Sequence, residues 1–109
     1  MSKPMSNKYH NRKTVTADGI RHDSKKEAHR WMELKLLERC GVIQGLKRQV
    51  KFELVPPVGG DRGAYYIADF VYMKNGETVV EDSKGYRTDL YKLKRKIFHW
   101  RYGIKIHET

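Results

Sequence analysis

The chain is poor in cysteine, in long apolar runs and in acidic residues. Cys40 is the only cysteine among the 109 residues, which excludes an internal disulfide framework and a zinc site built from several thiolates. No apolar run approaches the roughly 20 residues of a membrane-spanning helix. The N-terminus also lacks the hydrophobic segment of a signal peptide. We therefore expect a cytoplasmic protein with no membrane partner.

The shortage of acids leaves a strong positive charge. Lysine and arginine number 23 against 13 aspartates and glutamates, for a net charge of +10. A small basic protein most often has a polyanion as its partner, and nucleic acid is the commonest one. Residues 1–13 read as a basic arm without acids, and residues 14–109 as a single domain, because this length supports one modest core.

Hydrophobic periodicity predicts an α/β fold with a mixed sheet. The expected order is helix, strand, strand, strand, helix, strand, with an antiparallel meander and a last strand returned by a helix crossover. A short ribbon with a turn at Asp18-Gly19 is expected before the first helix. The expected elements are a helix between Ser24 and Gly41, a strand over 50–54, a hairpin over 64–84, a helix from Thr88 or Asp89 to Gly103, and a strand over 104–106.

The second helix carries two kinds of side chain on opposite faces. Its apolar residues fall on one face at helical spacing, and we expect that face to pack on the sheet. The apolar set is Leu90, Leu93, Ile97 and Trp100, and the opposite set is Lys92, Arg95, Lys96 and His99.

The hairpin brings two carboxylates together. Asn75-Gly76 is a strong turn signal, because both turn positions need positive φ. A symmetric hairpin centred there places Asp69 directly opposite Asp82, with Cβ atoms roughly 4.5–5.5 Å apart. Like charges in this position are destabilising, so we expect a divalent cation to compensate them.

The surroundings of this pair leave two interpretations open. Strand alternation places Asp69 in an otherwise apolar row with Ile67, Val71 and Met73, and places Lys84 on the same face as Asp82. Two carboxylates can hold Mg²⁺, and a lysine can orient an attacking water and offset charge on a phosphoryl group. In the structural alternative, Asp69 lies at a solvent-exposed edge of the sheet or forms a salt bridge with Lys84. Asp82 and Lys84 are then an ordinary charged strand end.

Glu27 also has two possible roles. It stands three residues after Ser24, which is the spacing of a capping box. On the helical wheel it shares a sector with Trp31 and Leu34, so it is expected to point inward near the start of the helix. There it could act as a third carboxylate beside the hairpin pair. Glu81 points to the opposite face, across from Phe70, and is expected to be structural or exposed.

Together these residues resemble the signature of PD-(D/E)XK nucleases: Glu27 on a first helix, Ala68-Asp69 on a strand, then Glu81-Asp82-Ser83-Lys84. The stretch from Asp18 to Glu108 is similar to a small phage and prophage family of presumed PD-(D/E)XK endonucleases, related in pattern to Holliday junction resolvases. Ala68 stands where the pattern nominally has proline.

The resemblance implies a restriction-endonuclease-like core and a set of roles. Asp69 and Asp82 would bind Mg²⁺ with the Ser83 carbonyl, Lys84 would be the catalytic lysine, and Glu27 the acid on the helix. Mn²⁺ would be able to replace Mg²⁺, and no small-molecule cofactor is implied. If the chain is phage-encoded, its compartment is the cytoplasm of a bacterial host.

These observations favour a Mg²⁺-dependent DNA endonuclease, with branched DNA such as a Holliday junction as the first choice of substrate. Two symmetric cuts would call for a homodimer. The alternatives are another PD-(D/E)XK nuclease, such as a nickase or a restriction-like enzyme, and a non-catalytic basic nucleic-acid-binding protein. The expected phosphate contacts are Arg12, Lys13, Lys25, Lys26, Arg87, Lys92 and Lys96.

Overall fold

The structure is a computed structural model that describes residues 13–83 and 86–109. Arg12 and the rest of the arm up to it, together with Lys84, lie outside the described residues. The elements are β1 (Thr14–Val15), β2 (Arg21–His22), α1 (Lys25–Arg39), β3 (Gln44–Val55), β4 (Ala64–Lys74), β5 (Glu77–Asp82), α2 (Asp89–Tyr102) and β6 (His107–Glu108). Their order confirms the prediction, including the short antiparallel ribbon β1–β2 ahead of α1.

The main sheet has four strands in the order β3-β4-β5-β6. The first three are antiparallel, while β6 runs parallel to β5. A parallel return needs a crossover, and α2 supplies it. The predicted mixed sheet is therefore confirmed, and the fold is of the mixed α+β kind.

Two strand boundaries differ from the prediction. The last strand forms at 107–108 rather than 104–106, because the ladder with β5 starts only at His107, although Ile104 and Ile106 pack in the core. β3 begins at Gln44, six residues before the predicted start at residue 50. Its first half is rich in Gln, Lys and Arg, so it lacks the apolar alternation by which a strand is recognised.

Capping residues fix the ends of both helices. The hydroxyl oxygen of Ser24 accepts a hydrogen bond from the amide of Glu27 at 3.1 Å, and Thr88 caps α2 through the amide of Tyr91 at 3.0 Å. Gly103, with φ 69°, ends α2 in a left-handed conformation. The predicted start of α1 at Ser24 is confirmed, and Thr88 rather than Asp89 is the cap of α2.

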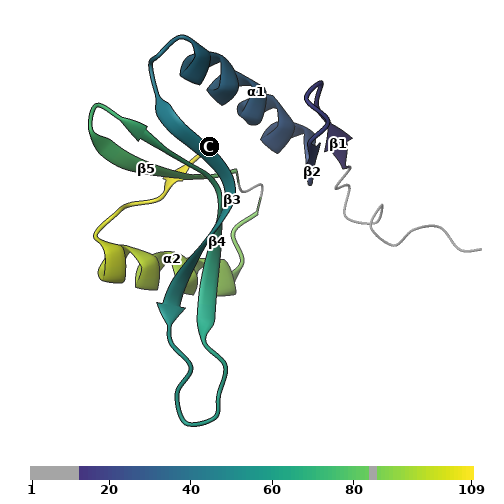
Figure 1. The fold of residues 1–109 in the computed structure, drawn as a ribbon. Coiled ribbons are helices and arrows are strands. Elements are labelled where there is room, and N and C mark those ends of the chain that lie inside the picture. The colour runs from purple at the N-terminus through teal and green to yellow at the C-terminus, as the bar shows by residue number, and fades with distance from the viewer. Residues whose placement is uncertain (1–12, 84–85) are drawn as a thin grey trace, which may run out of the picture.

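The sheet lies between the two helices. In the view of Figure 1, α1 lies above and α2 below β5. Val80 of β5 belongs to the core formed with Tyr91 and Phe98 of α2. Its neighbour Glu81 points the other way and bonds to Arg30 of α1. Successive residues of β5 therefore tie the sheet to opposite helices.

The predicted buried face of α2 is wrong for three of its four residues, and only Ile97 packs, partly buried, against the core. Leu90, Leu93 and Trp100 are 62%, 54% and 82% exposed, whereas Tyr91 and Phe98 are buried. The sheet presents aromatic rings to this helix, and Phe98 packs 5.4 Å from the ring of Tyr66. Aromatic packing of this kind contributes beyond simple area burial, and it decides which face turns inward.

Candidate active site

The hairpin turn sets the register of β4 and β5. Asn75 and Gly76 both have positive φ, 52° and 79°, as the turn requires. The ladder runs without a shift from Lys74↔Glu77 to Phe70↔Glu81. The next positions along it are Asp69 and Asp82. The predicted register is therefore confirmed up to the residues that flank the two aspartates.

The alternation of side chains resets at Asp69. Ala68 packs in the core on the α2 side, while Phe70 packs in the core on the α1 side. An unbroken strand would put both on one face. The β3–β4 ladder pairs Arg48 with Phe70 and Val50 with Ala68, but it does not pair Gln49 with Asp69, which lie between them. Gln49 has a left-handed φ of 54°, uncommon for a residue other than glycine, and it marks the break.

This break overturns one prediction about the surroundings of Asp69. The apolar row of Ile67, Asp69, Val71 and Met73 does not form, because Ile67 is 52% exposed whereas Val71 packs on the α2-side core. Asp69 therefore occupies a kink between the two faces rather than the middle of an apolar strip.

Asp69 links three elements of the fold. Its Oδ2 accepts a hydrogen bond from the backbone amide of Ser83 at 2.7 Å, at the end of β5. Its Oδ1 lies 3.5 Å from Nε2 of Gln49 on β3. The same nitrogen donates to Oε2 of Glu27 on α1 at 3.2 Å. The carboxamide of Gln49 thus lies between two carboxylates that come from distant parts of the chain.

Glu27 is buried, and its carboxylate points into this site. The backbone amide of Glu27, not its carboxylate, bonds to the hydroxyl oxygen of the Ser24 cap. Burial, and after it the nearby charge of Asp69, raise the pKa of Glu27 to about 7. Arg48 and His22 lie 3.9 and 3.7 Å from Oε2. Glu27 can therefore serve the cap through its backbone while its side chain faces Asp69.

Asp82 is fully buried on the α2 side of β5. Its Oδ2 accepts a hydrogen bond from the hydroxyl of Tyr66 at 2.5 Å, and its carbonyl accepts one from the amide of Thr109 at 3.0 Å. Burial and the bond to Asp82 raise the pKa of Tyr66, so its hydroxyl stays protonated as a donor. The Asp82 side chain is held in one orientation by this contact.

Glu81 was expected to be either structural or exposed, and it has a structural role. It is fully buried and accepts two hydrogen bonds from Arg30, at 2.8 and 2.6 Å, and one from Tyr72. Burial alone would raise its pKa, but the guanidinium and the tyrosine hydroxyl together lower it. This group holds α1, and with it Glu27 one turn away, against β5.

The predicted phosphate contacts fall into separate groups. Lys25 and Lys26 are exposed in the first turn of α1, next to Glu27, and Lys92 and Lys96 are exposed one turn apart on α2. Lys13 is paired with Asp23 at 2.9 Å. Arg87 is paired with Glu108 at 3.0 Å, which occupies it within the protein. Arg12 lies outside the described residues.

Sequence reasoning missed Gln49 and Tyr66. Gln49 lay outside the predicted strands, and Tyr66 looked like one of several strand aromatics. The only signal for Gln49 in the sequence was its position, as a polar residue directly before the alternating strand residues Val50, Phe52 and Leu54.

The donor set around Asp69 suits a hard cation such as Mg²⁺. Carboxylate and carbonyl oxygens are its preferred ligands, and it is commonly held by one or two carboxylates while it keeps several waters. Within the described residues, no three His, Cys, Asp or Glu side chains gather closely enough to form a metal cage. The buried Glu27 and the partly buried Asp69 repel each other, and this pair fits an ion held by few protein ligands.

In the described part of the chain, no helix is long and apolar enough to cross a membrane.

Comparison with known proteins gives one family. Neither the curated proteins nor the solved structures contain a match. One family model, described as a protein of unknown function (DUF1064), matches residues 6–108.

Proposed function

The chain belongs to the DUF1064 family, and we propose that it is a Mg²⁺-dependent DNA endonuclease with a restriction-endonuclease-like core of the PD-(D/E)XK type. The observation that carries this proposal is the meeting of Glu27 from α1 and Asp69 from β4 at the end of β5. Their carboxylates share the nitrogen of Gln49, and burial together with Asp69 raises the pKa of Glu27 to about 7.

Two neighbouring carboxylates in a partly buried site are costly. Arg48, at 3.9 Å from Oε2 of Glu27, offsets only part of this cost, because the pKa of Glu27 is still raised to about 7. Asp69, Asp82 and the Ser83 carbonyl are the groups that would hold Mg²⁺, with Glu27 close by. When bound, this ion would lower the pKa of a coordinated water and polarise a phosphate oxygen.

The remaining steps belong to the chain's own residues. Lys84, two positions after Asp82, would orient the attacking water and offset charge on the phosphate. The Ser83 amide holds Asp69 in place through its 2.7 Å bond, and Tyr66 holds Asp82. The exposed Lys25 and Lys26 would bind flanking phosphates without reading sequence. Branched DNA remains the proposed substrate, cut by a symmetric homodimer.

The test is cleavage of labelled DNA. A four-way junction, a matched duplex and a single strand are incubated with Mg²⁺, with Mn²⁺ or with EDTA. Metal-dependent paired cuts in the junction support a resolvase, and cuts in every substrate point to another nuclease of the type. Absence of cleavage with either ion refutes the proposal.

Substitutions separate catalysis from folding. We expect Asp69→Asn, Asp82→Asn and Lys84→Ala each to reduce cleavage by at least about 100-fold, as the loss of one electrostatic group at a reacting centre does. Glu77→Gln and Lys74→Ala change exposed residues of the same hairpin and are the matched controls. Binding of the junction in EDTA, with an unchanged circular dichroism spectrum, shows that each inactive variant is folded.

A non-catalytic nucleic-acid-binding protein is the second candidate, and one observation favours it. Asp82 is fully buried and bonded to Tyr66, which is an arrangement typical of a structural carboxylate. This candidate predicts binding that Mg²⁺ does not affect and no cleavage by the wild-type protein.

A further inference from the structure

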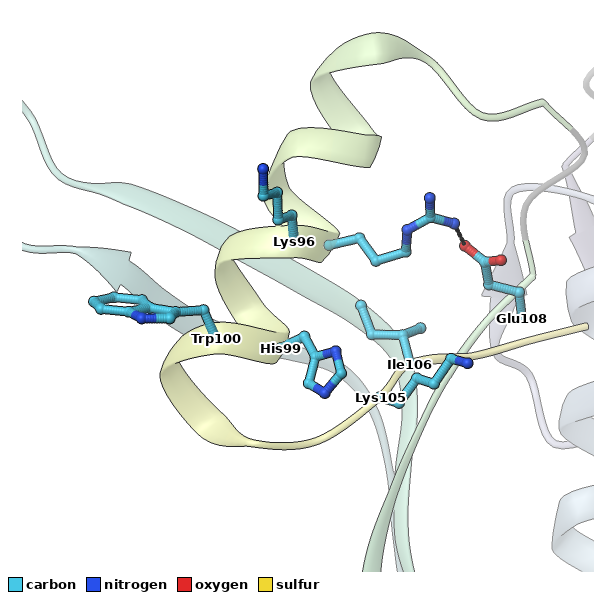
Figure 2. Close-up of a pocket in the computed structure, with 7 residues that line it drawn as sticks. Lys96, His99, Trp100, Lys105, Ile106 and Glu108 are labelled. Carbon is cyan, nitrogen blue, oxygen red and sulfur yellow. Dashed lines mark hydrogen bonds and ion pairs between the residues drawn. The ribbon is translucent and has the colours of Figure 1, made fainter.

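A groove runs along α2 on the side of the last strand, away from Glu27 and Asp69. It is lined by Lys96, His99 and Trp100 of α2 and by Lys105, Ile106 and Glu108 at the C-terminal end of the chain. Figure 2 shows His99 and Lys105 close to one another beside the last turn of the helix, with Lys96 and Trp100 projecting outward from it. We call this feature the α2–β6 groove.

The α2–β6 groove is positively charged. The only carboxylate in its described lining, Glu108, is already paired with Arg95 at 2.8 Å and with Arg87 at 3.0 Å. Among the ion pairs that join described residues, none includes Lys96 or Lys105. Their charges are therefore uncompensated, which favours an anionic ligand.

Trp100 gives the groove an aromatic surface. It is 82% exposed, whereas Trp31, the other tryptophan, is buried and stacked on Phe70. An indole in water beside lysines has no structural benefit, since its burial is what stabilises a fold. Exposed aromatics next to cations are the pattern by which proteins bind single-stranded nucleic acid: the bases stack and the cations follow the backbone.

We propose that the α2–β6 groove binds single-stranded DNA, with phosphates on Lys96 and Lys105 and a base stacked on Trp100. A duplex has its bases already stacked and offers no free face to the indole. A second copy of this chain would bring like charges together, which disfavours it as the occupant. The inference rests on the proposed function for its choice of DNA as the polymer.

The position of the groove suggests its use. Glu108 pairs with Asp82 in the parallel β5–β6 ladder, so one end of the groove adjoins the strand that carries a proposed metal ligand. The groove would hold an unpaired strand that leads to or from the cleavage site. Such strands occur at branches and ends of DNA, not within intact duplex.

The test is binding in EDTA, where no cleavage occurs. A fluorescein-labelled oligo(dT) of about 20 nucleotides is titrated with protein and followed by anisotropy, with a duplex of equal length in parallel. We expect Trp100→Ala to weaken binding of the single strand by about 5- to 100-fold, and to leave duplex binding unchanged. Leu36→Ala removes an exposed apolar residue of α1 and is the control.

Lysine substitutions test the phosphate contacts. Lys96→Ala and Lys105→Ala should each lower the slope of log affinity against log salt by about 0.7, the value for one phosphate on a single strand. Lys74→Ala, on the hairpin turn, should leave the slope unchanged. Intrinsic fluorescence gives a second measure, because oligo(dT) should quench the exposed Trp100 and the quenching should vanish in Trp100→Phe.

Three results would overturn the inference: equal loss of duplex and single-strand binding in Trp100→Ala, equal binding of polyglutamate, or self-association that depends on Trp100. Refutation of the proposed nuclease activity can be distinguished from refutation of the groove. In that case the protein would not cleave DNA with Mg²⁺, while the titrations in EDTA would still show binding that depends on Trp100.

Discussion

The backbone amide of Ser83 donates a hydrogen bond of 2.7 Å to Oδ2 of Asp69. The bond fixes a side chain of β4 to the backbone of β5 just beyond the last pair of their ladder. Asp69 therefore has two separable functions. It satisfies an amide that is partly removed from water, and it places a negative charge beside Glu27.

Asp69→Asn and Asp69→Ala separate these functions. Asparagine keeps an acceptor oxygen for Ser83, so we expect the free energy of unfolding to fall by less than about 1 kcal/mol. Alanine leaves the amide unpaired, which costs about 1–3 kcal/mol. Urea unfolding followed by circular dichroism measures both. Equal destabilisation by the two substitutions would mean that the charge of Asp69, not its hydrogen bond, sustains the fold.

Divalent ions are expected to stabilise the folded protein. Glu27 and Asp69 repel each other, and an ion that binds only the folded state adds about 2.7 kcal/mol when its concentration is 100 times its dissociation constant. Thermal unfolding should therefore shift upward with Mg²⁺ or Mn²⁺, and not with NaCl of equal ionic strength. Asp69→Asn should abolish the shift while Glu77→Gln keeps it. A shift of equal size in Asp69→Asn would place the ion elsewhere.

The sequence allowed a good part of this site to be predicted. Asn75-Gly76 specifies a turn with two positive φ angles, and the turn fixes the register that carries Asp69 towards Asp82. Ser24 fixes the start of α1 and so the inward direction of Glu27. Both features follow from the stereochemistry of a few neighbouring residues, so they can be predicted without knowledge of the rest of the fold.

The features that could not be predicted depend on packing between segments that are distant in the sequence. The left-handed Gln49 breaks the alternation of β4 from a neighbouring strand, and no local pattern around Asp69 reports it. On α2, leucine periodicity suggested one buried face, but the aromatic surface of the sheet selected Tyr91 and Phe98 instead. Both outcomes depend on what lies across the interface rather than on the segment itself.

The pair of Arg30 and Glu81 is expected to be a main support of α1. Glu81 is fully buried, and removal of Arg30 would leave its charge uncompensated. Arg30→Met should lower the free energy of unfolding by about 3–5 kcal/mol, the cost of a broken buried pair. Chemical unfolding of the variant measures it.

The double variant Arg30→Met with Glu81→Leu is the matched control. It removes both charges, so the loss should be well below the sum of the single losses. Glu33→Gln removes only the exposed partner of Arg30, at 3.2 Å, and should change stability by less than about 1 kcal/mol. Additive single losses would show that Arg30 and Glu81 stabilise the protein independently.

Acid should weaken the contact between Asp18 and Trp31. The indole N–H donates to Oδ2 of Asp18 at 2.7 Å. Hydrogen bonds from Thr16 and Trp31 hold the pKa of Asp18 well below its ordinary value of 3.8. Because the folded-state pKa is lowered, the stabilisation is present above pH 3.8 and is lost as the pH falls through the folded-state value.

Asp18→Asn should therefore be less stable than wild type at pH 7, and the difference should narrow below about pH 4. Thermal unfolding followed by far-ultraviolet circular dichroism at pH 7 and pH 3 measures it without interference from Trp100. Asp61→Asn, in the exposed loop between β3 and β4, is the control and should follow wild type at both pH values. A gap that stays constant with pH would assign the stabilisation to the shape of the Asp18 side chain rather than to its charge.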